Sequence, residues 1–553
     1  MLQPQSIKRR VLIELAHNRD LASSAFAAGP ASERGLDVGS VPQLSGVEFD
    51  STCAPTAIPG LRARTAFDAG YVSGRRFDLA LEPTESTYVV RAELEEGRIE
   101  ETTGHSAVRG VYADVEIQPA LICPSSGPMG TDADVARLLC VPQMSANGMD
   151  GSGVLMAIVD TGFNLAYLAG KGKVLNLDRA RSWVPAAGMT PGDAPVSHGT
   201  MCAFDAAIAA PKATFLDIQL LRSTATGVSP MAGLLSDGVR AFDHLIRIMT
   251  APRRPGETRS LVVSNSWGMF HPSWDLPVGN AGNYSDNPNH PFNRIVAALE
   301  AAGADILFAA GNCGRDCPDG RCSGVTSNAI YGANGHSAVI TVAGVDITST
   351  RVGYSTQGPG RLAVNKPDIA AFTHFQGSGV YPADGGTSAA TPVAAGVVAA
   401  LRTKRPYVPG NPAVTPIAVR NLLRTTAEDK GGAGFDFDYG FGVIDGCELS
   451  RGFRPLPGPA GICVRYPRLC RELPHRFRAP GPFPVPDREP WRGGGGPILS
   501  GTGDEPSELE DLIATVFKAG YHEGQKASGT TEATIGEKKH ADCGCGGKGR
   551  AQN

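Results

Sequence analysis

The sequence predicts an α/β protein with a mostly parallel sheet flanked by helices, preceded by a small α+β unit. From about residue 130 to 450, short apolar runs alternate with segments of helical periodicity. Strands that alternate with helices are joined by crossover connections, which give a parallel sheet covered on both faces. Upstream, residues 87–94 and 108–117 alternate apolar and polar side chains, as half-buried strands do.

Local patterns predict the individual elements within this plan. The apolar runs expected as buried strands are residues 154–159, 261–263 and 306–310. Residues 231–249 and 292–302 have the pattern of helices. In open parallel sheets, sites are built at the carboxyl ends of strands, so polar residues directly after these runs are the first candidates for chemistry.

Composition predicts which partners the protein lacks. The chain has 553 residues, more than a single core usually organises, so two or more folded parts are expected. Its net charge is −4, which argues against nucleic acid and anionic membranes as partners. No apolar run approaches the roughly 18 residues that a membrane span needs. The expected partner is a peptide or protein substrate.

Composition also divides the chain into five predicted parts. These are an N-terminal unit (1–125), an α/β domain (126–452), a Pro/Gly/Arg-rich linker (453–505), a short amphipathic helix (506–523) and a disordered Cys/Gly tail (524–553). Ser507 and Glu510 make a capping box at the start of the amphipathic helix. We expect that helix to dock on its own domain or on a partner.

The N-terminus predicts a cytoplasmic location. The apolar stretch after Lys8 is short and is interrupted by Glu14, whereas a secretory signal needs a longer apolar region. Export by a route without a recognisable signal is the alternative. In a reducing compartment, most of the twelve cysteines should be thiols.

Four polar residues have the local settings that amide hydrolysis requires: a nucleophile, a base, a group that orients the base, and an oxyanion donor. Asp160 follows the apolar run 154–159, and His198 precedes an Ala-rich helical stretch. Ser388 lies in Gly-Gly-Thr-Ser at the start of a helix of small residues, where backbone N–H groups face an oxyanion. Asn312 follows another apolar run, and its amide is the candidate oxyanion donor.

The order Asp, His, Ser distinguishes this set from two other classes of triad. The chymotrypsin order is His, Asp, Ser, and the α/β-hydrolase order is Ser, acid, His. Ser388 also lacks a Gly-x-Ser-x-Gly elbow, which weakens a lipase or esterase interpretation.

Four blocks in order resemble the signature blocks of the subtilases, the subtilisin-like serine peptidases of family S8. The blocks are Ile158-Val-Asp-Thr-Gly162, His198-Gly-Thr200, Ala309-Ala-Gly-Asn312 and Gly386-Thr-Ser-Ala-Ala-Thr-Pro392. The resemblance implies a subtilisin-like domain and a serine endopeptidase. Asp160 would then orient His198, His198 would be base and then acid, and Ser388 would form the acyl-enzyme with Asn312 in the oxyanion hole.

The resemblance also implies how substrate binds. An extended peptide would pair with segments that also line the primary specificity pocket. These substrate-binding residues are Ser264, Asn265, Ser266, Trp267, Gly268, Ala309, Ala310 and Gly311. Catalysis would need no cofactor; structural calcium is common in the family, but no acidic loop here identifies its ligands. The alternative function is a catalytically silent binding or scaffolding protein with the same fold.

Two further features are interpreted with this family in view. Residues 1–125 are similar to the inhibitory prodomain of many subtilases, which predicts autocatalytic maturation near residues 119–132. Cys313, Cys317 and Cys322 lie just past Asn312, and they indicate a metal site, a redox switch, or a surface insertion with thiols or one disulfide. The roles of Cys543 and Cys545 in the tail stay open.

Overall fold

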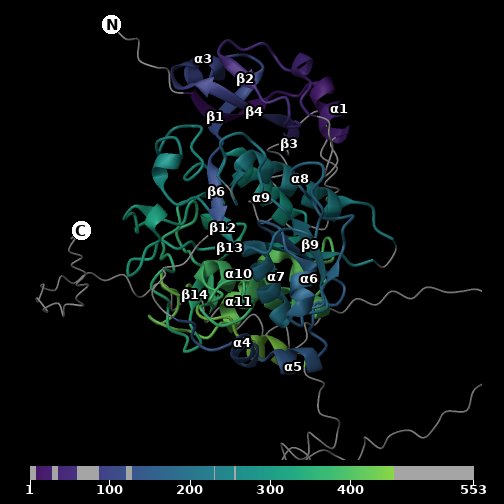
Figure 1. The fold of residues 1–553 in the computed structure, drawn as a ribbon, viewed down its shortest axis with the longest axis vertical. Helices are drawn as coiled ribbons and strands as arrows, with labels where there is room; N and C mark the ends of the chain where they lie inside the picture. Colours follow the sequence, from purple (N-terminus) through teal and green to yellow (C-terminus); the bar gives the residue numbers. More distant parts are fainter. Residues whose placement is uncertain are drawn as a thin grey trace, which may run out of the picture. The chain divides into compact units, whose positions relative to one another are not determined.

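The structure is a computed structural model that describes residues 8–27, 35–58, 86–119, 127–229, 231–254 and 257–453 (Figure 1). The chain divides into two compact units, Met1–Gly458 and Pro459–Asn553, and all described residues belong to the first. The predicted linker, amphipathic helix and tail therefore lie outside the described residues. None of the helices in the described ranges is long and apolar enough to cross a membrane.

A seven-stranded parallel sheet is the centre of the fold, as predicted, in the order β15-β14-β13-β11-β7-β9-β8. Its strands are β7 (Val154–Val159), β8 (Asn176–Leu177), β9 (Thr214–Ile218), β11 (Ser260–Asn265), β13 (Ala304–Ala309), β14 (Ile340–Val345) and β15 (Ile369–Phe372). The interior strand β7 is buried along its whole length, and its side chains alternate between two cores.

Helices cover both faces of this sheet. One core packs the even-numbered β7 residues against α4 (Asp132–Leu138), α5 (Val141–Ala146), α7 (His198–Ala209), α10 (Gly386–Lys404), α11 (Pro416–Thr426) and α12 (Gly446–Arg451). The other packs the odd-numbered residues against α8 (Leu235–Thr250) and α9 (Pro291–Ala301). A short helix, α6 (Leu165–Gly170), follows β7.

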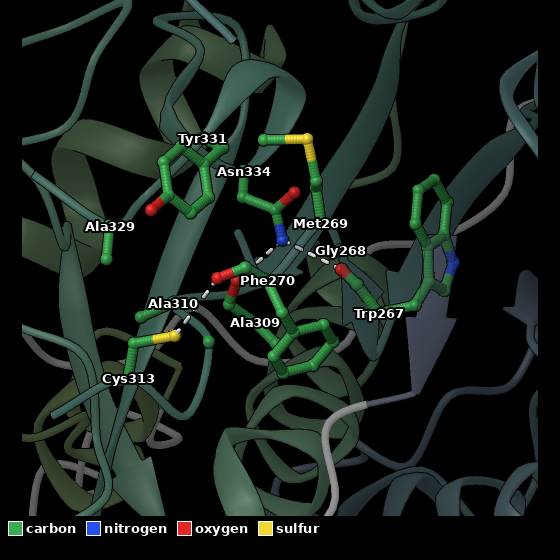
Figure 2. A pocket seen from close by; sticks show the side chains of 11 residues that line it. Trp267, Gly268, Met269, Phe270, Ala309, Ala310, Cys313, Ala329, Tyr331 and Asn334 are labelled. Carbon is green, nitrogen blue, oxygen red and sulfur yellow. Dashed lines mark hydrogen bonds between the residues drawn. The ribbon is translucent and has the colours of Figure 1, made fainter. Parts of the chain in front are cut away.

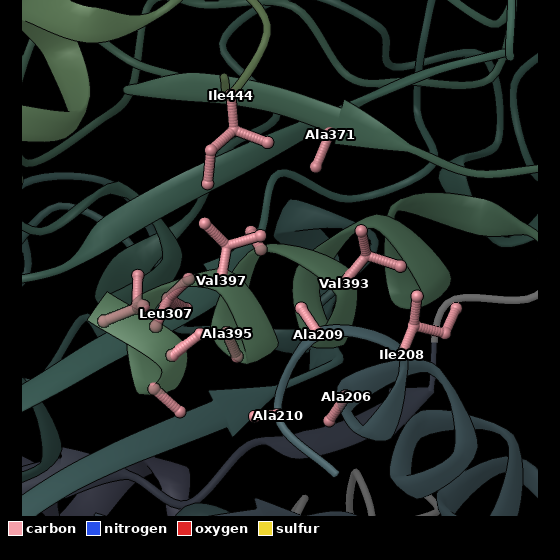
Figure 3. Close-up of a cluster of buried hydrophobic side chains, with 14 of the residues drawn as sticks. Ala206, Ile208, Ala209, Ala210, Leu307, Ala371, Val393, Ala395, Val397 and Ile444 are labelled. Carbon is pink, nitrogen blue, oxygen red and sulfur yellow. The ribbon is translucent and has the colours of Figure 1, made fainter. Parts of the chain in front are cut away.

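Small residues let α7 and α10 lie close together. Figure 3 shows Ala206 and Ala209 of α7 near Val393 and Ala395 of α10. A Cβ on Gly396 would lie 2.4 Å from the carbonyl oxygen of Ala206, so glycine is required at this crossing. The close packing matters because α7 carries His198 and α10 carries Ser388.

The N-terminal unit contains strands and helices, as the predicted α+β class requires, and its strands form an antiparallel sheet with the order β2-β4-β1-β5 and β3 paired to β4. It contains β1 (Lys8–Leu15), β2 (Val47–Phe49), β3 (Thr56–Ile58), β4 (Thr87–Glu95) and β5 (Val108–Ala113), with helices α1 (Arg19–Ala27) and α3 (Ile99–Thr103).

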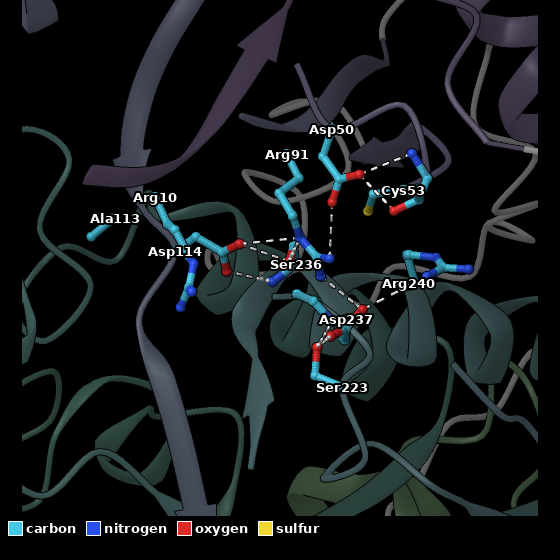
Figure 4. A network of polar contacts seen from close by, with 12 residues as sticks. Arg10, Asp50, Cys53, Arg91, Ala113, Asp114, Ser223, Ser236, Asp237 and Arg240 are labelled. Atoms are coloured by element: carbon cyan, nitrogen blue, oxygen red, sulfur yellow. Dashed lines mark hydrogen bonds and ion pairs between the residues drawn. The ribbon is translucent and has the colours of Figure 1, made fainter. Parts of the chain in front are cut away.

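Buried ion pairs join the N-terminal sheet to α8. Figure 4 shows Arg91 of β4 between three carboxylates. Its guanidinium lies 2.8 Å from Asp237 of α8, 3.4 Å from Asp114 and 3.3 Å from Asp50. Ser236 donates to Asp114 through both its backbone N–H and its hydroxyl. The Arg91 side chain is only 8% exposed, so these charges compensate one another out of water.

The strand predicted over residues 108–117 is two strands, because Asp114 interrupts it. Strand β5 ends at Ala113, Asp114 turns to Arg91 and Ser236, and β6 (Glu116–Pro119) leaves the N-terminal sheet. Strand β6 then pairs antiparallel with both β10 (Gly233–Leu234) and β12 (Trp267–Gly268). The N-terminal unit thus places an extended segment across the edge of the α/β domain.

The cysteine pattern differs from the expected preponderance of thiols. Cys140 is bonded to Cys447 and Cys313 to Cys322, and Cys317 is also disulfide-bonded. Among the described cysteines, only Cys53 and Cys202 are free. Disulfides persist mainly in oxidising compartments, so this pattern counts against the reducing environment from which the thiols were predicted.

Candidate active site

Three elements bring the predicted triad residues together. Asp160 directly follows β7, His198 is the first residue of α7, and Ser388 lies in the first turn of α10. All three are buried, at 1% exposure or less. The carboxyl end of a central parallel strand and the N-termini of two closely packed helices meet here, which is the expected place for a site in such a sheet.

The Asp160 carboxylate holds the His198 ring. Nδ1 of His198 lies 2.9 Å from Oδ1 and 3.0 Å from Oδ2 of Asp160. The Thr161 N–H donates to the same Oδ1 at 2.7 Å, which fixes the carboxylate. A carboxylate is an acceptor only, so Nδ1 carries the hydrogen and Nε2 is left as the basic nitrogen. Nε2 is buried and has no hydrogen-bond partner within the described part of the chain.

Two glycines permit this approach of α7 to the end of β7. A Cβ on Gly199 would lie 2.5 Å from the carbonyl oxygen of Gly162, and Gly162 itself has φ +82°. The Gly199 N–H then donates to Thr161 Oγ1 at 2.9 Å. The glycine after the histidine is therefore a packing requirement, as a side chain would push the imidazole away from Asp160.

A proline frees the backbone carbonyl of Ser388. Pro392, four residues along α10, has no N–H to give that carbonyl its helical hydrogen bond. The Ser266 hydroxyl donates to it instead at 2.9 Å, and the Cys202 thiol lies 3.7 Å from it. In return, Ser388 Oγ donates to the carbonyl oxygen of Ser266 at 3.1 Å. Ser388 is thus bonded to Ser266, the residue between β11 and β12.

The Cys202 thiol packs behind the triad. Its Sγ lies 3.8 Å from His198 Nδ1 and 3.7 Å from Asp160 Oδ2. Ligand atoms of these three residues fall within 4.8 Å of one another, close enough together to hold a metal ion. However, burial, followed by the Asp160 charge, raises the pKa of Cys202 well above its ordinary value. Burial and the neighbouring carboxylate therefore favour the protonated thiol.

Asn312 is anchored at the start of α10. Its Oδ1 accepts from the Thr387 N–H and from the Thr387 hydroxyl, each at 3.0 Å. Because both bonds engage Oδ1, the donor end of the amide, Nδ2, faces away from Thr387. The Gly311 N–H donates to Thr387 Oγ1 at 3.1 Å, so the loop after β13 is fixed directly beside the nucleophile candidate.

A small apolar pocket opens beside these residues (Figure 2). Five of the eight predicted substrate-binding residues line it, from its two walls: Trp267, Gly268, Ala309, Ala310 and Gly311. The three not in its lining are Ser264, Asn265 and Ser266. Ser264 and Asn265 are part of β11, where the Asn265 amide donates to Leu307 O at 2.9 Å. Ser266 contacts Ser388 instead.

Sequence reasoning missed the rest of the pocket. Its other lining residues are Met269, Phe270, Cys313, Ala329, Tyr331 and Asn334. Except for Cys313, these lie in segments without a motif, so no local signal identified them. The Trp267 indole points into the core, where its Nε1 donates to Val159 O at 2.9 Å, so only the remainder of this residue faces the pocket.

Comparison with known proteins identifies the family of the chain. The sequence model of the family described as "Subtilase family" matches residues 151–442. Subtilisin BL from Lederbergia lenta is 25% identical over 307 residues, which are 55% of this chain and 93% of the relative. Subtilisin E from Bacillus subtilis (strain 168) is 26% identical over 313 residues, 55% of this chain and 67% of the relative. An alkaline protease from Alkalihalobacillus alcalophilus is 24% identical over 426 residues, 74% of this chain and 97% of the relative.

Proposed function

Because the chain belongs to the subtilase family, we propose that it is a serine endopeptidase that cuts extended peptides through an acyl-enzyme on Ser388. The two pairings of β6 carry this proposal. Strand β6 lies between β10 and β12 and pairs antiparallel with both, so the space between those two strands, here called the peptide groove, already holds a peptide in an extended conformation. Backbone pairing of this kind recognises a peptide by strand addition.

The register of β6 determines which residue of a longer peptide would lie beside Ser388. Pro119 lies opposite Trp267, and Gln118 lies opposite Gly268. A peptide that continues this antiparallel pairing brings its next residue opposite Ser266, whose carbonyl accepts from Ser388 Oγ. The reacting carbonyl would therefore lie between the serine and the Asn312 amide.

Within this proposal each residue has one role. The Ser388 hydroxyl turns from the Ser266 carbonyl to Nε2 of His198, which takes its proton as Oγ attacks. Asp160 keeps the imidazole in the tautomer with the hydrogen on Nδ1 and stabilises the imidazolium. The Ser388 N–H and Asn312 Nδ2 stabilise the oxyanion, and the imidazolium then protonates the leaving amine.

The N-terminal unit is proposed to be an inhibitory prodomain. Its strand β6 occupies the peptide groove, and Arg91 and Asp114 hold the start of that strand against α8. The match to the alkaline protease, which spans 74% of this chain, is longer than the part matched by the family model. We therefore expect cleavage downstream of Pro119, near residues 119–132, to release the groove.

Fluorophosphonate labelling of the purified full chain, read by intact mass, tests the proposed function. We expect one adduct on wild type and none on Ser388→Ala, because only an activated serine reacts. If wild type is unlabelled before and after removal of the N-terminal unit, the protein is a silent binding or scaffolding relative. Labelling that persists in Ser388→Ala would exclude this serine as the nucleophile.

A further inference from the structure

The loop between Cys313 and Cys322 lies against the peptide groove. It begins directly after Asn312 and is closed by the disulfide between its two ends, both of which are buried. The Asp319 N–H donates to the Asn312 carbonyl at 2.8 Å, and Cys313 Sγ lies 3.7 Å from the carbonyl oxygen of Phe270 (Figure 2). The closed loop is therefore fixed both to the oxyanion candidate and to the pocket wall.

This loop holds one guanidinium rigidly. Asp319 accepts from Arg321 Nε at 3.0 Å and from Nη2 at 2.8 Å, which is a bidentate pair. The guanidinium carbon lies 3.7 Å from the centre of the Phe270 ring, so the group is stacked as well as paired. Nε and Nη2 both bond to Asp319, and the third nitrogen, Nη1, makes its hydrogen bond outside the loop.

Nη1 of Arg321 reaches the strand that occupies the groove. It donates to Gln118 Oε1 of β6 at 3.0 Å. Glu116 Oε1 accepts from the other end of the same amide, Gln118 Nε2, at 2.6 Å. The contact joins residues 203 positions apart in the sequence, and it is made to the side chain of the bound strand. A side-chain contact of this kind distinguishes one peptide sequence from another, which backbone pairing cannot do.

We propose that the disulfide-closed loop 313–322 is a specificity subsite, in which Arg321 selects Gln or Glu in the peptide. The inference rests on the proposed function and names the substrate class of the same groove. The selected position is the one occupied by Gln118, two residues before the residue that lies opposite Ser266. In a substrate it is the third residue on the amino side of the cleaved bond.

The chemistry of the guanidinium sets the preference. Gln and Glu both offer an acceptor oxygen at the end of a chain with two methylenes, which is the reach that Gln118 uses. A leucine there would leave Nη1 without its acceptor, and a lysine would add a like charge. Asp319 already pairs with Arg321, and a Glu could not donate to Glu116 as the Gln118 amide does, so we expect Gln to be accepted better than Glu and both better than Leu.

Four quenched peptides test this selection. They carry Glu-Ile-X-Pro-Ala-Leu, which is the chain's own sequence over residues 116–121 with Gln118 replaced by X, and X is Gln, Glu, Leu or Lys. The Arg321 side chain is 22% exposed, so we expect kcat/KM for the Gln and Glu peptides to exceed that for Leu by only about 5- to 10-fold, with Lys lowest. Arg321→Met should reduce this ratio to within about 2-fold.

Arg315→Met is the matched control. Arg315 is an exposed residue of the same loop, and its backbone N–H, which the substitution keeps, donates to Gln357 Oε1 at 3.1 Å. The variant should retain the full ratio between the Gln and Leu peptides. If wild type cleaves all four peptides alike, the subsite is wrong and the proposed function stands. If wild type takes the fluorophosphonate but cleaves none of the four, β6 still fills the groove, and the hydrogen-exchange comparison of Arg321→Met with Arg315→Met decides the inference.

A second measurement decides the case in which wild type neither labels nor cleaves, so that the proposed function fails. Hydrogen exchange in residues 116–119 is followed in the full chain with Ser388→Ala, alone and with Arg321→Met or Arg315→Met. Exchange about 5-fold faster with Arg321→Met than with Arg315→Met supports Arg321 as a peptide-holding residue. Equal exchange in the two variants overturns the inference.

Discussion

The candidate catalytic centre and the attachment network of the N-terminal unit (Arg91, Asp50, Asp114 and Asp237) are both buried polar networks, but they are assembled differently. At the centre, Asp160, His198 and Ser388 sit at the ends of regular elements and are oriented by neighbouring backbone groups. In the attachment network, Arg91 of β4 contacts Asp114, which lies between β5 and β6, and Asp237 of α8. In the first network, Asp160 is fixed by the N–H of its sequence neighbour Thr161, whereas in the second the Arg91 guanidinium is held by side chains that are not its neighbours in the sequence.

We therefore expect the two networks to have different roles: the first takes part in the proposed reaction, and the second attaches the N-terminal unit. In the proposed reaction the groups of the candidate centre change their charge or bonding, so their substitution should alter turnover more than folding. The groups of the attachment network only hold the N-terminal unit against α8, so their substitution should alter stability and the exposure of the peptide groove. The variants below test whether the two effects can be obtained independently.

The largest expected effect belongs to the centre. Asp160→Asn should reduce kcat by about 10⁴-fold, the size known for neutralising the orienting carboxylate in another class of serine protease. An amide presents an N–H₂ group where Oδ1 and Oδ2 now accept from Nδ1, which favours the wrong tautomer of His198. Peptide hydrolysis and urea unfolding measure the two consequences, and unfolding should change little.

Asp193→Asn is the control for Asp160→Asn. Its side chain is 59% exposed and lies 3.5 Å from Arg179, so neither turnover nor stability should change appreciably. An Asp160→Asn variant that keeps more than a tenth of wild-type kcat would contradict the role given to Asp160.

The fold and much of the candidate site could be predicted because their signals are short-range. An apolar run that precedes Asp160 and a proline four residues after Ser388 each have a physical reason within a few residues, and the glycine that lets His198 approach Gly162 is directly next to that histidine in the sequence. The prediction of one strand over 108–117 was wrong because Asp114 is drawn away by Arg91, and no local pattern shows a contact of that kind. The contact of Arg321 with Gln118 was missed for the same reason.

The next largest effect is expected for the attachment network around Arg91. Arg91→Met should lower the free energy of unfolding of the N-terminal unit by about 3–5 kcal/mol, because it leaves Asp114 and Asp237 buried without their cation. Urea unfolding, together with hydrogen exchange in Thr87–Glu95, measures it. Fluorophosphonate labelling should become faster as β6 loosens, since no group of the centre is altered.

Arg98→Met makes the same change on an exposed arginine of the same unit. Its side chain is 38% exposed and pairs with Glu95 and Glu101 at 3.8 and 3.4 Å, so we expect a loss below about 1 kcal/mol. Equal losses in the Arg91 and Arg98 variants would show that the buried network does not hold the unit.

Acid should also weaken the attachment of the N-terminal unit, by a smaller amount, through His290, which contacts Ala113 of that unit. This fully buried residue caps α9: its Nδ1 accepts from the Phe292 N–H at 3.2 Å, and its Nε2–H donates to Ala113 O of β5 at 3.0 Å. Burial is the main cause that lowers the pKa of His290 to about 4, and Arg294 adds to it. The native state therefore keeps this imidazole neutral where an unfolded chain protonates it.

The sign of the pH dependence follows from that difference. Above about pH 6.5 both states are neutral at His290; between 6.5 and 4 the unfolded state binds the extra proton, so stability falls by up to about 3 kcal/mol as pH falls. Urea unfolding at pH 7, 5.5 and 4 measures the slope. His290→Asn keeps a capping side chain without a titrating group and should flatten the slope, whereas the exposed His105→Asn should not. A slope unchanged by His290→Asn would exclude His290 as the source of the acid sensitivity.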